Sequence, residues 1–171
     1  MCLHAVAQVD YYANHDTVTG SNVIYKVKFE ASWDAYDISN INNIYDDEPY
    51  RYQDGTLVEE ADRFAAIPIG DHKQLYRQAV EETFTAAEIT GLRSSNERVV
   101  IVDTFSTSSG DVMEVTFSFY RRPKLYSIPP DKWFTFEQKI KAYIKYTIPP
   151  LCQALTFMGS TTFLYFDKLY N

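Results

Sequence analysis

Hydrophobic and polar residues alternate in two segments of the first 33 residues, and such alternation is typical of β-strands. In the segment 21–33, one face would carry Val23, Tyr25, Val27, Phe29, Ala31 and Trp33. In the segment 3–11 it would carry Leu3, Ala5, Ala7, Val9 and Tyr11. A polar stretch that ends in Gly20 separates the two segments. The pattern therefore predicts a β-hairpin over residues 3–33, with one buried and one solvent-facing side.

A second hairpin is predicted over residues 97–120. The run 97–105 is rich in β-branched residues, the run 111–120 alternates cleanly, and Gly110 in the turn between them can take a positive φ. Asp103 interrupts the first run. If Ile101 and Phe105 point inward, Asp103 does too, and a buried carboxylate needs a partner. The interpretation favoured from sequence places Asp103 on the solvent-facing side, beside a bulge.

Helical spacing predicts two helices. The first opens at Asp71, which resembles a capping-box residue with Gln74, and ends at Gly91. Its apolar stripe consists of Leu75, Ala79, Val80, Phe84 and Ala87. The second helix begins with Asp131 as N-cap, and Pro149 and Pro150 end it. Its stripe consists of Trp133, Phe136, Ile140, Tyr143, Ile144 and Thr147.

The order of these elements predicts an α+β fold in a single domain, residues 1–171. Two hairpins and a C-terminal strand over residues 161–171 would form an antiparallel sheet, with the two helices packed on one face and a curved or partly barrel-like sheet as the variant. Residues 34–62 would project as an acidic hairpin or loop. Within them, Asp54-Gly55 is a strong two-residue turn signal, and an isolated hairpin of this kind must pack on something to be stable.

The charge distribution and the tyrosine content indicate candidate contact surfaces. The chain has 14 Tyr and a net charge of −7, but residues 1–119 hold 20 of the 23 acids and residues 120–171 hold half of the 16 bases. Tyrosine suits both strands and interfaces. The charge asymmetry favours electrostatic docking within the fold or between copies. The candidate partner-binding residues are Tyr45, Asp46, Asp47, Glu48, Tyr50, Arg51 and Tyr52 in the acidic segment, and Tyr120, Arg121, Arg122, Lys124, Lys141 and Lys145 in the basic part.

Metal and nucleic-acid binding find little support in the sequence. His4, His15 and His72 have no ligand spacing, and the acidic segment lacks the spacing and central glycine of an EF-hand, although a weak carboxylate site for calcium or magnesium stays open. Basic residues flanked by tyrosines at 120–126 resemble a nucleic-acid patch, but the acidic chain would repel a polyanion. A solvated strand end or a protein partner is the favoured interpretation.

No catalytic motif emerges, and we expect no cofactor. The chain contains neither a nucleophile elbow nor a phosphate-binding loop. Cys152 sits in an apolar segment that predicts an inert, buried thiol, and Cys2 is remote from it, so both are expected to be free. The start MCLHAVAQVD does not resemble a signal peptide, and no segment approaches the roughly 18 apolar residues of a membrane span. A cytoplasmic or virion location is expected.

These features favour a non-catalytic structural or assembly protein that associates with itself or docks into a larger complex. A virion or phage-tail subunit is an example of this class of protein. The acidic hairpin of one copy would meet the basic surface of the next. The alternative is a small-molecule-binding enzyme or carrier whose pocket lies between a curved sheet and the helices, lined by tyrosines, Trp33 and Asp103. An adaptor that binds a basic partner through the acidic hairpin is a third hypothesis.

Overall fold

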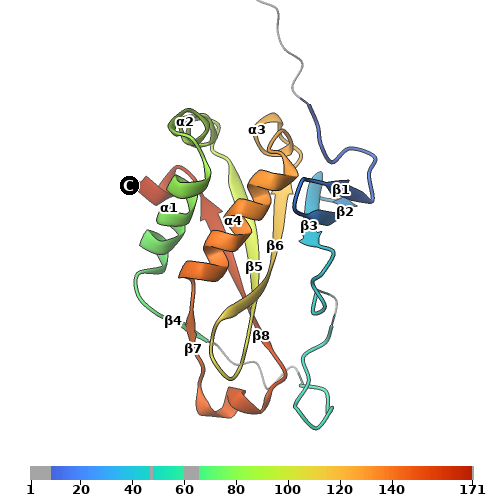
Figure 1. Cartoon of the computed structure of the whole chain (residues 1–171), viewed down its shortest axis with the longest axis vertical. Coiled ribbons are helices and arrows are strands. Elements are labelled where there is room, and N and C mark those ends of the chain that lie inside the picture. Colours follow the sequence, from blue (N-terminus) through green and yellow to red (C-terminus); the bar gives the residue numbers. More distant parts are fainter. Residues whose placement is uncertain (1–8, 47, 60–65, 171) are drawn as a thin grey trace, which may run out of the picture.

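The computed structural model describes residues 9–46, 48–59 and 66–170, and its centre is a six-stranded antiparallel sheet (Figure 1). The strand order is β1-β2-β3-β6-β5-β8. The strands are β1 (Thr17–Thr19), β2 (Ile24–Glu30), β3 (Ala35–Asn40), β5 (Arg98–Phe105), β6 (Val112–Tyr120) and β8 (Met158–Tyr165). A separate two-stranded sheet pairs β4 (Ile67–Pro68) with β7 (Tyr146–Thr147). The predicted α+β class with an antiparallel sheet is confirmed.

Helices cover one face of the large sheet. Figure 1 shows α1 (His72–Thr83) and α4 (Pro130–Tyr143) lying across it, while α2 (Ala86–Ser94) and the short α3 (Pro123–Tyr126) lie at one end. Two 3-10 helices, η2 (Pro150–Ala154) and η3 (Lys168–Tyr170), flank β8 in the sequence. None of the helices in the described ranges is long and apolar enough to cross a membrane.

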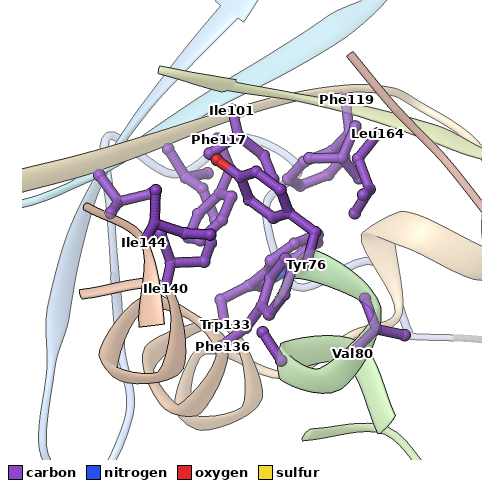
Figure 2. Close-up of a cluster of buried hydrophobic side chains, with 14 of the residues drawn as sticks. Tyr76, Val80, Ile101, Phe117, Phe119, Trp133, Phe136, Ile140, Ile144 and Leu164 are labelled. Atoms are coloured by element: carbon purple, nitrogen blue, oxygen red, sulfur yellow. The ribbon is translucent and has the colours of Figure 1, made fainter. Parts of the chain in front are cut away.

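Aromatic rings fill the layer between sheet and helices (Figure 2). Trp133 of α4 stacks on Phe119 of β6 with ring centroids 5.1 Å apart, and Phe136 stacks on Phe117 at 5.6 Å. All four rings are buried, as is Tyr76 of α1. Burial of one such ring stabilises the fold by about 1.5–3 kcal/mol. The helix-covered side is therefore a packed core in which these aromatic side chains occupy the space between β6 and α4.

The first hairpin differs from its prediction. Residues 3–8 lie outside the described residues, and the strand that pairs with β2 is the three-residue β1, inside the segment predicted as a loop. Strand β2 ends at Glu30, three residues earlier than predicted, so Trp33 lies in the following turn and is 69% exposed instead of facing the core. The turn at 31–34 contains Asp34 with φ +46°, a left-handed conformation that a continuing strand does not adopt.

A central strand was missed in the acidic segment. Residues 35–40 form β3, which lies between β2 and β6, because Tyr36 and Ile38 face the core while Asp37 faces the opposite side. The hairpin over 97–120 is confirmed, and its turn holds Gly110 at φ +74°. The C-terminal strand begins earlier than predicted, at Met158, and ends at Tyr165.

The helix boundaries also differ. The first predicted helix is two, because Thr85 starts α2 with a complete capping box to Glu88, and Gly91 lies inside α2 instead of ending it. Asp71 does cap α1, accepting a hydrogen bond from the Gln74 amide. The N-cap of α4 is Pro129, not Asp131. Asp131 lies in the first turn and accepts hydrogen bonds from the Ser21 and Asn22 amides.

Candidate groove on the open face of the sheet

The face of the sheet opposite the helices carries a groove of about 540 Å³, which we call the open-face groove. It lies where β2 turns into β3 and where β6 ends, next to the last residues of β8. Its apolar walls come from Trp33, Val100 and Phe163, and Phe163 is 59% exposed. The other lining residues are Glu30, Ala35, Asp37, Arg98, Ser118, Phe119 and Tyr120.

Strand alternation places these side chains on one face. Register pairs Val100 with Phe163 on β8 and with Ser118 on β6, and Ser118 in turn pairs with Asp37 on β3. Their sequence neighbours Val99 and Leu164 point to the helix side and are buried. The groove therefore follows from the register of four adjacent strands, with Trp33 added from the β2–β3 turn.

Charged groups of both signs border the groove. Arg98 donates a hydrogen bond to the Tyr120 hydroxyl, and its guanidinium lies 4.7 Å from the centroid of that ring. Glu30 pairs with Lys28 at 2.6 Å. The groove thus joins exposed rings with fixed hydrogen-bonding groups, a combination that suits binding more than nucleophilic or proton-transfer chemistry.

Of the residues predicted as partner-binding, Tyr120 lines this groove. Sequence reasoning missed Arg98, Val100 and Phe163. One signal was available: the run Val99, Val100, Ile101, Val102 is apolar at every position, which indicates a strand with contacts on both faces.

The acidic segment packs on its own chain. The Asp54-Gly55 turn is confirmed, with Gly55 at φ +89° and a bridge between Arg51 and Leu57. The rings of Tyr45 and Tyr50 lie on Phe157, with centroids 4.4 and 5.1 Å apart. The other contacts of this segment are a bridge between Tyr52 and Leu155 and a hydrogen bond from the Gln53 amide to the Ala154 carbonyl. The hairpin therefore rests on η2 and the start of β8, an apolar surface.

The described part of the chain holds no group of three His, Cys, Asp or Glu side chains that could bind a metal ion. Asp46 accepts hydrogen bonds from the side chains of Asn43 and Thr116, and it lies 3.7 Å from the Lys26 ammonium. Glu48 is exposed, and Asp47 lies outside the described residues. Asp46 therefore ties the segment to β6 and β2.

Four of the predicted basic residues pair with acids of the same chain. Arg121 pairs with Asp10 at 3.4 Å, and Arg122 lies 4.0 Å from Glu97. Two more pairs are Lys141 with Glu137, both on α4, and Lys145 with Asp111, in which Lys145 immediately precedes β7. Lys124 lies beside Gly91 of α2. Among the described residues, these four basic side chains thus pair with acids outside the 44–52 segment.

Glu114 anchors residues 44 and 45 within the acidic segment, and replacing Glu114 should make these two residues more mobile. The carboxylate of Glu114 accepts hydrogen bonds from the amides of Ile44 at 2.7 Å and Tyr45 at 3.1 Å. We expect Glu114→Ala to lower the free energy of unfolding by about 1–3 kcal/mol, because two amides lose a charged acceptor. Hydrogen exchange at residues 44 and 45 measures the local effect. Unchanged exchange there would contradict the anchoring role, and Glu81→Ala on the exposed side of α1 is the control.

Asp103 is fully buried, so the prediction of a solvent-facing position is wrong. A register shift does occur next to it, between Thr104 and Phe105, but it leaves Asp103 on the helix side. Its Oδ2 accepts hydrogen bonds from the hydroxyls of Tyr76 on α1, at 2.6 Å, and Tyr146 on β7, at 2.8 Å. Two phenols thus satisfy Oδ2, whereas the buried Oδ1 has no hydrogen-bond partner among the described residues.

The surroundings of Asp103 shift its protonation. Burial raises the pKa of Asp103 to about 6, while the two tyrosine hydrogen bonds act in the opposite direction. The His72 ring contacts both tyrosine rings edge-on, and burial lowers the pKa of this histidine. Asp103 does not line the open-face groove. Its hydrogen bonds connect β5 to α1 and β7, which is a structural task.

These observations define the protein as an α+β domain with an antiparallel sheet, covered by helices on one face and grooved on the other. Comparison with known proteins supports the fold. The similar solved structures include a DUF5043 family protein from Bacteroides uniformis, with a TM-score of 0.76 and 18% sequence identity over 93% of this chain and 89% of that one. The sequence matches no family model, and it matches no curated protein. At this identity the likeness shows the fold alone.

Proposed function

We propose that this chain is a non-catalytic assembly protein that docks a second copy of itself through the open-face groove. The observation that carries the proposal is the pair of exposed rings, Trp33 and Phe163, which border a groove of about 540 Å³ on a sheet face without a helix layer. Exposed apolar surface rimmed by polar groups is typical of interaction sites. Aromatic side chains with an arginine beside them are also enriched in such contacts.

The opposite end of the molecule offers side chains that suit the groove. The hairpin and η2 lie at the end of the sheet away from the β2–β3 turn (Figure 1). Ile44, Leu57 and Leu151 are exposed there. A contact between unlike ends is heterologous, so it repeats from copy to copy and forms a ring or a filament. This arrangement keeps the head-to-tail assembly expected from sequence but replaces its charge pairing with apolar contact.

Salt dependence distinguishes apolar docking from charge-driven docking. The basic residues that sequence analysis assigned to docking are near acids of the same chain, and each copy carries a net charge of −7. Added salt screens the repulsion between two acidic copies, and it would weaken a contact between opposite charges. Groove-mediated association should therefore persist or strengthen as the salt concentration rises.

Replacement of Trp33 by Ala should weaken self-association and raise its dissociation constant at least tenfold. Loss of a large ring at the centre of an interface typically costs about 2 kcal/mol, which exceeds the 1.4 kcal/mol of a tenfold change. Because Trp33 is exposed, the fold should keep its stability. Light scattering at low and high salt measures the mass. Ile24→Ala, on the same face but outside the groove, is the matched control and should associate like the unmodified chain.

Two results would overturn the proposal. One is a monomer at high protein concentration at both low and high salt, and the other is a mass that falls as salt is added and is the same in the Trp33→Ala variant.

A small ligand is the second candidate occupant, because the groove volume lies within the range of about 300–1,000 Å³ that small-molecule sites show. Trp33 reports on this directly. A monomer whose tryptophan fluorescence changes with a titrated ligand, and whose response disappears in Trp33→Phe, would favour the carrier function.

A further inference from the structure

Arg98 differs from the neighbouring arginines in the kind of partner that it has. Its guanidinium donates a hydrogen bond to the Tyr120 hydroxyl and lies over the ring of that tyrosine. Among the described residues no carboxylate pairs with Arg98, whereas Arg121 and Arg122 each pair with one. A guanidinium has five N–H donors in a planar fork. Arg98 therefore presents oriented donors beside the exposed rings of the groove, an arrangement that suits a carboxylate.

The hairpin of the acidic segment presents a leucine and a glutamate on its outer face. The Val58 amide donates a hydrogen bond to the Tyr50 carbonyl, so the paired backbone continues past Leu57. Val58 packs against the core, and side chains alternate along an extended chain. Leu57 and Glu59 therefore point to the other side, where both are exposed. Within the described part of the chain, no ion pair engages Glu59, so its carboxylate is available to a second copy.

The charges of the groove and of the hairpin are complementary in one orientation. The acidic groups of the groove, Asp37 among them, lie on β2 and β3, and Arg98 lies across the groove on β5. The hairpin also carries both signs, because Arg51 lies opposite Leu57 and Glu59 follows two residues later. When Glu59 meets Arg98, the hairpin arginine lies towards the acidic side of the groove. The reverse orientation sets like charges against each other, so complementarity selects the first.

We propose that Glu59 of one copy binds Arg98 of the next, and that this ion pair sets the register of the head-to-tail contact. Leu57 then lies against Trp33 and Phe163. The inference rests on the proposed function, because it names the residues that meet in the open-face groove. Apolar contact supplies the affinity, and the ion pair disfavours other registers, in which these charges would be enclosed without partners. Enclosure by the rings shields the pair from salt, so association persists as the salt concentration rises.

Charge reversal in the full chain tests the pair, with the mass measured by light scattering. Arg98→Glu and Glu59→Arg should each raise the dissociation constant of self-association at least tenfold, because each variant sets two like charges against each other. The two variants mixed in equal amounts should associate again, since each groove then meets a hairpin of opposite charge. The double variant Arg98→Glu/Glu59→Arg should associate for the same reason. Glu48→Arg reverses another exposed acid of the acidic segment, and as the matched control it should associate like the unmodified chain.

Recovery on mixing also shows that both single variants fold, because a misfolded copy offers no complementary surface. Unchanged association of either single variant, or no recovery in the mixture, would overturn the pairing. The proposed function fails in a different way. A monomeric unmodified chain overturns both proposals, whereas association that responds to Trp33→Ala but not to Arg98→Glu overturns the pairing alone.

Discussion

Replacement of Gly110 by Ala should destabilise the fold by at least about 3 kcal/mol, because it combines an unfavourable backbone conformation with a backbone clash. Gly110 has φ +74°, a region that residues with a Cβ occupy only at a cost. A Cβ at this position would overlap the carbonyl oxygen of Tyr146 and lie 2.9 Å from its carbonyl carbon. Neither atom belongs to a flexible side chain, so a rotamer change cannot relieve the overlap.

The clash falls on a junction of the fold. The Gly110 carbonyl accepts a hydrogen bond from the Tyr146 amide, and the Gly110 amide donates to the Ser106 carbonyl. Tyr146 also stacks on Phe105 with ring centroids 4.1 Å apart. Moving the backbone of Tyr146 away from Gly110 therefore disturbs both the β5–β6 turn and the contact between β7 and β5.

Gly55→Ala is the matched control for this substitution. Gly55 has a similar φ of +89°, but an added Cβ there would meet nothing within 4 Å. The free energy of unfolding of Gly55→Ala should fall by only about 1–2 kcal/mol, the cost of a left-handed backbone conformation for a residue with a Cβ. Urea unfolding of both variants measures the difference. For a chain of this length, Gly110→Ala should lower the melting temperature by about 10 °C, several degrees more than Gly55→Ala. Equal losses would contradict a steric role for the Tyr146 backbone.

The sequence predicted the elements whose periodicity reflects one buried face. The hairpin 97–120 was predicted correctly because its side chains alternate and its turn is rich in small residues. Strand β3 was missed although Tyr36 and Ile38 alternate with Asp37 and Ser39, because the run has only six residues and lies in a segment whose acidic side chains favoured a loop. The break between α1 and α2 carried a signal, since Thr85 and Glu88 have capping-box spacing, but the continuing apolar stripe concealed it.

The open-face groove could not be predicted in the same way. Its walls come from the β2–β3 turn and from strands as far apart in sequence as β2 and β8. Local patterns do not tell which strand β8 will join, and a strand order such as β6-β5-β8 is a property of the whole fold. Acidic and basic residues are unevenly distributed along the sequence, as the sequence analysis found, but the structure pairs many of these charges within one chain. Because Trp33 lies in the β2–β3 turn, its place in the wall of the groove could not be predicted without the position of that turn.

Acidification should stabilise the native chain relative to an Asp103→Asn variant. The pKa of Asp103 is about 6 in the folded state and 3.8 when unfolded, so the folded state binds the proton more tightly. The stabilisation is therefore fully present below about pH 3.8 and is lost as the pH rises through about 6. A difference of about two pKa units corresponds to about 3 kcal/mol.

Asparagine isolates this effect because it keeps the shape and an acceptor oxygen but does not titrate. That oxygen can still accept the hydroxyls of Tyr76 and Tyr146, which both donate to Oδ2 of Asp103. We expect the free energy of unfolding of the native chain, minus that of the variant, to rise by about 2 kcal/mol between pH 7.5 and pH 4, because the full effect is reached only at lower pH. Urea titrations at four pH values across this range measure it.

The comparison between the two chains matters more than either stability alone. Other carboxylates act in the opposite direction: hydrogen bonds from Lys139 and Tyr143 lower the pKa of Glu82 to about 2, and hydrogen bonds from Ser21 lower that of Asp131. Acid therefore removes stability through those groups, in both chains equally, and the subtraction cancels it. Tyr146→Phe should shift the Asp103 transition to higher pH, since it removes a donor that favours the carboxylate. A difference that does not change with pH would mean that burial does not perturb Asp103.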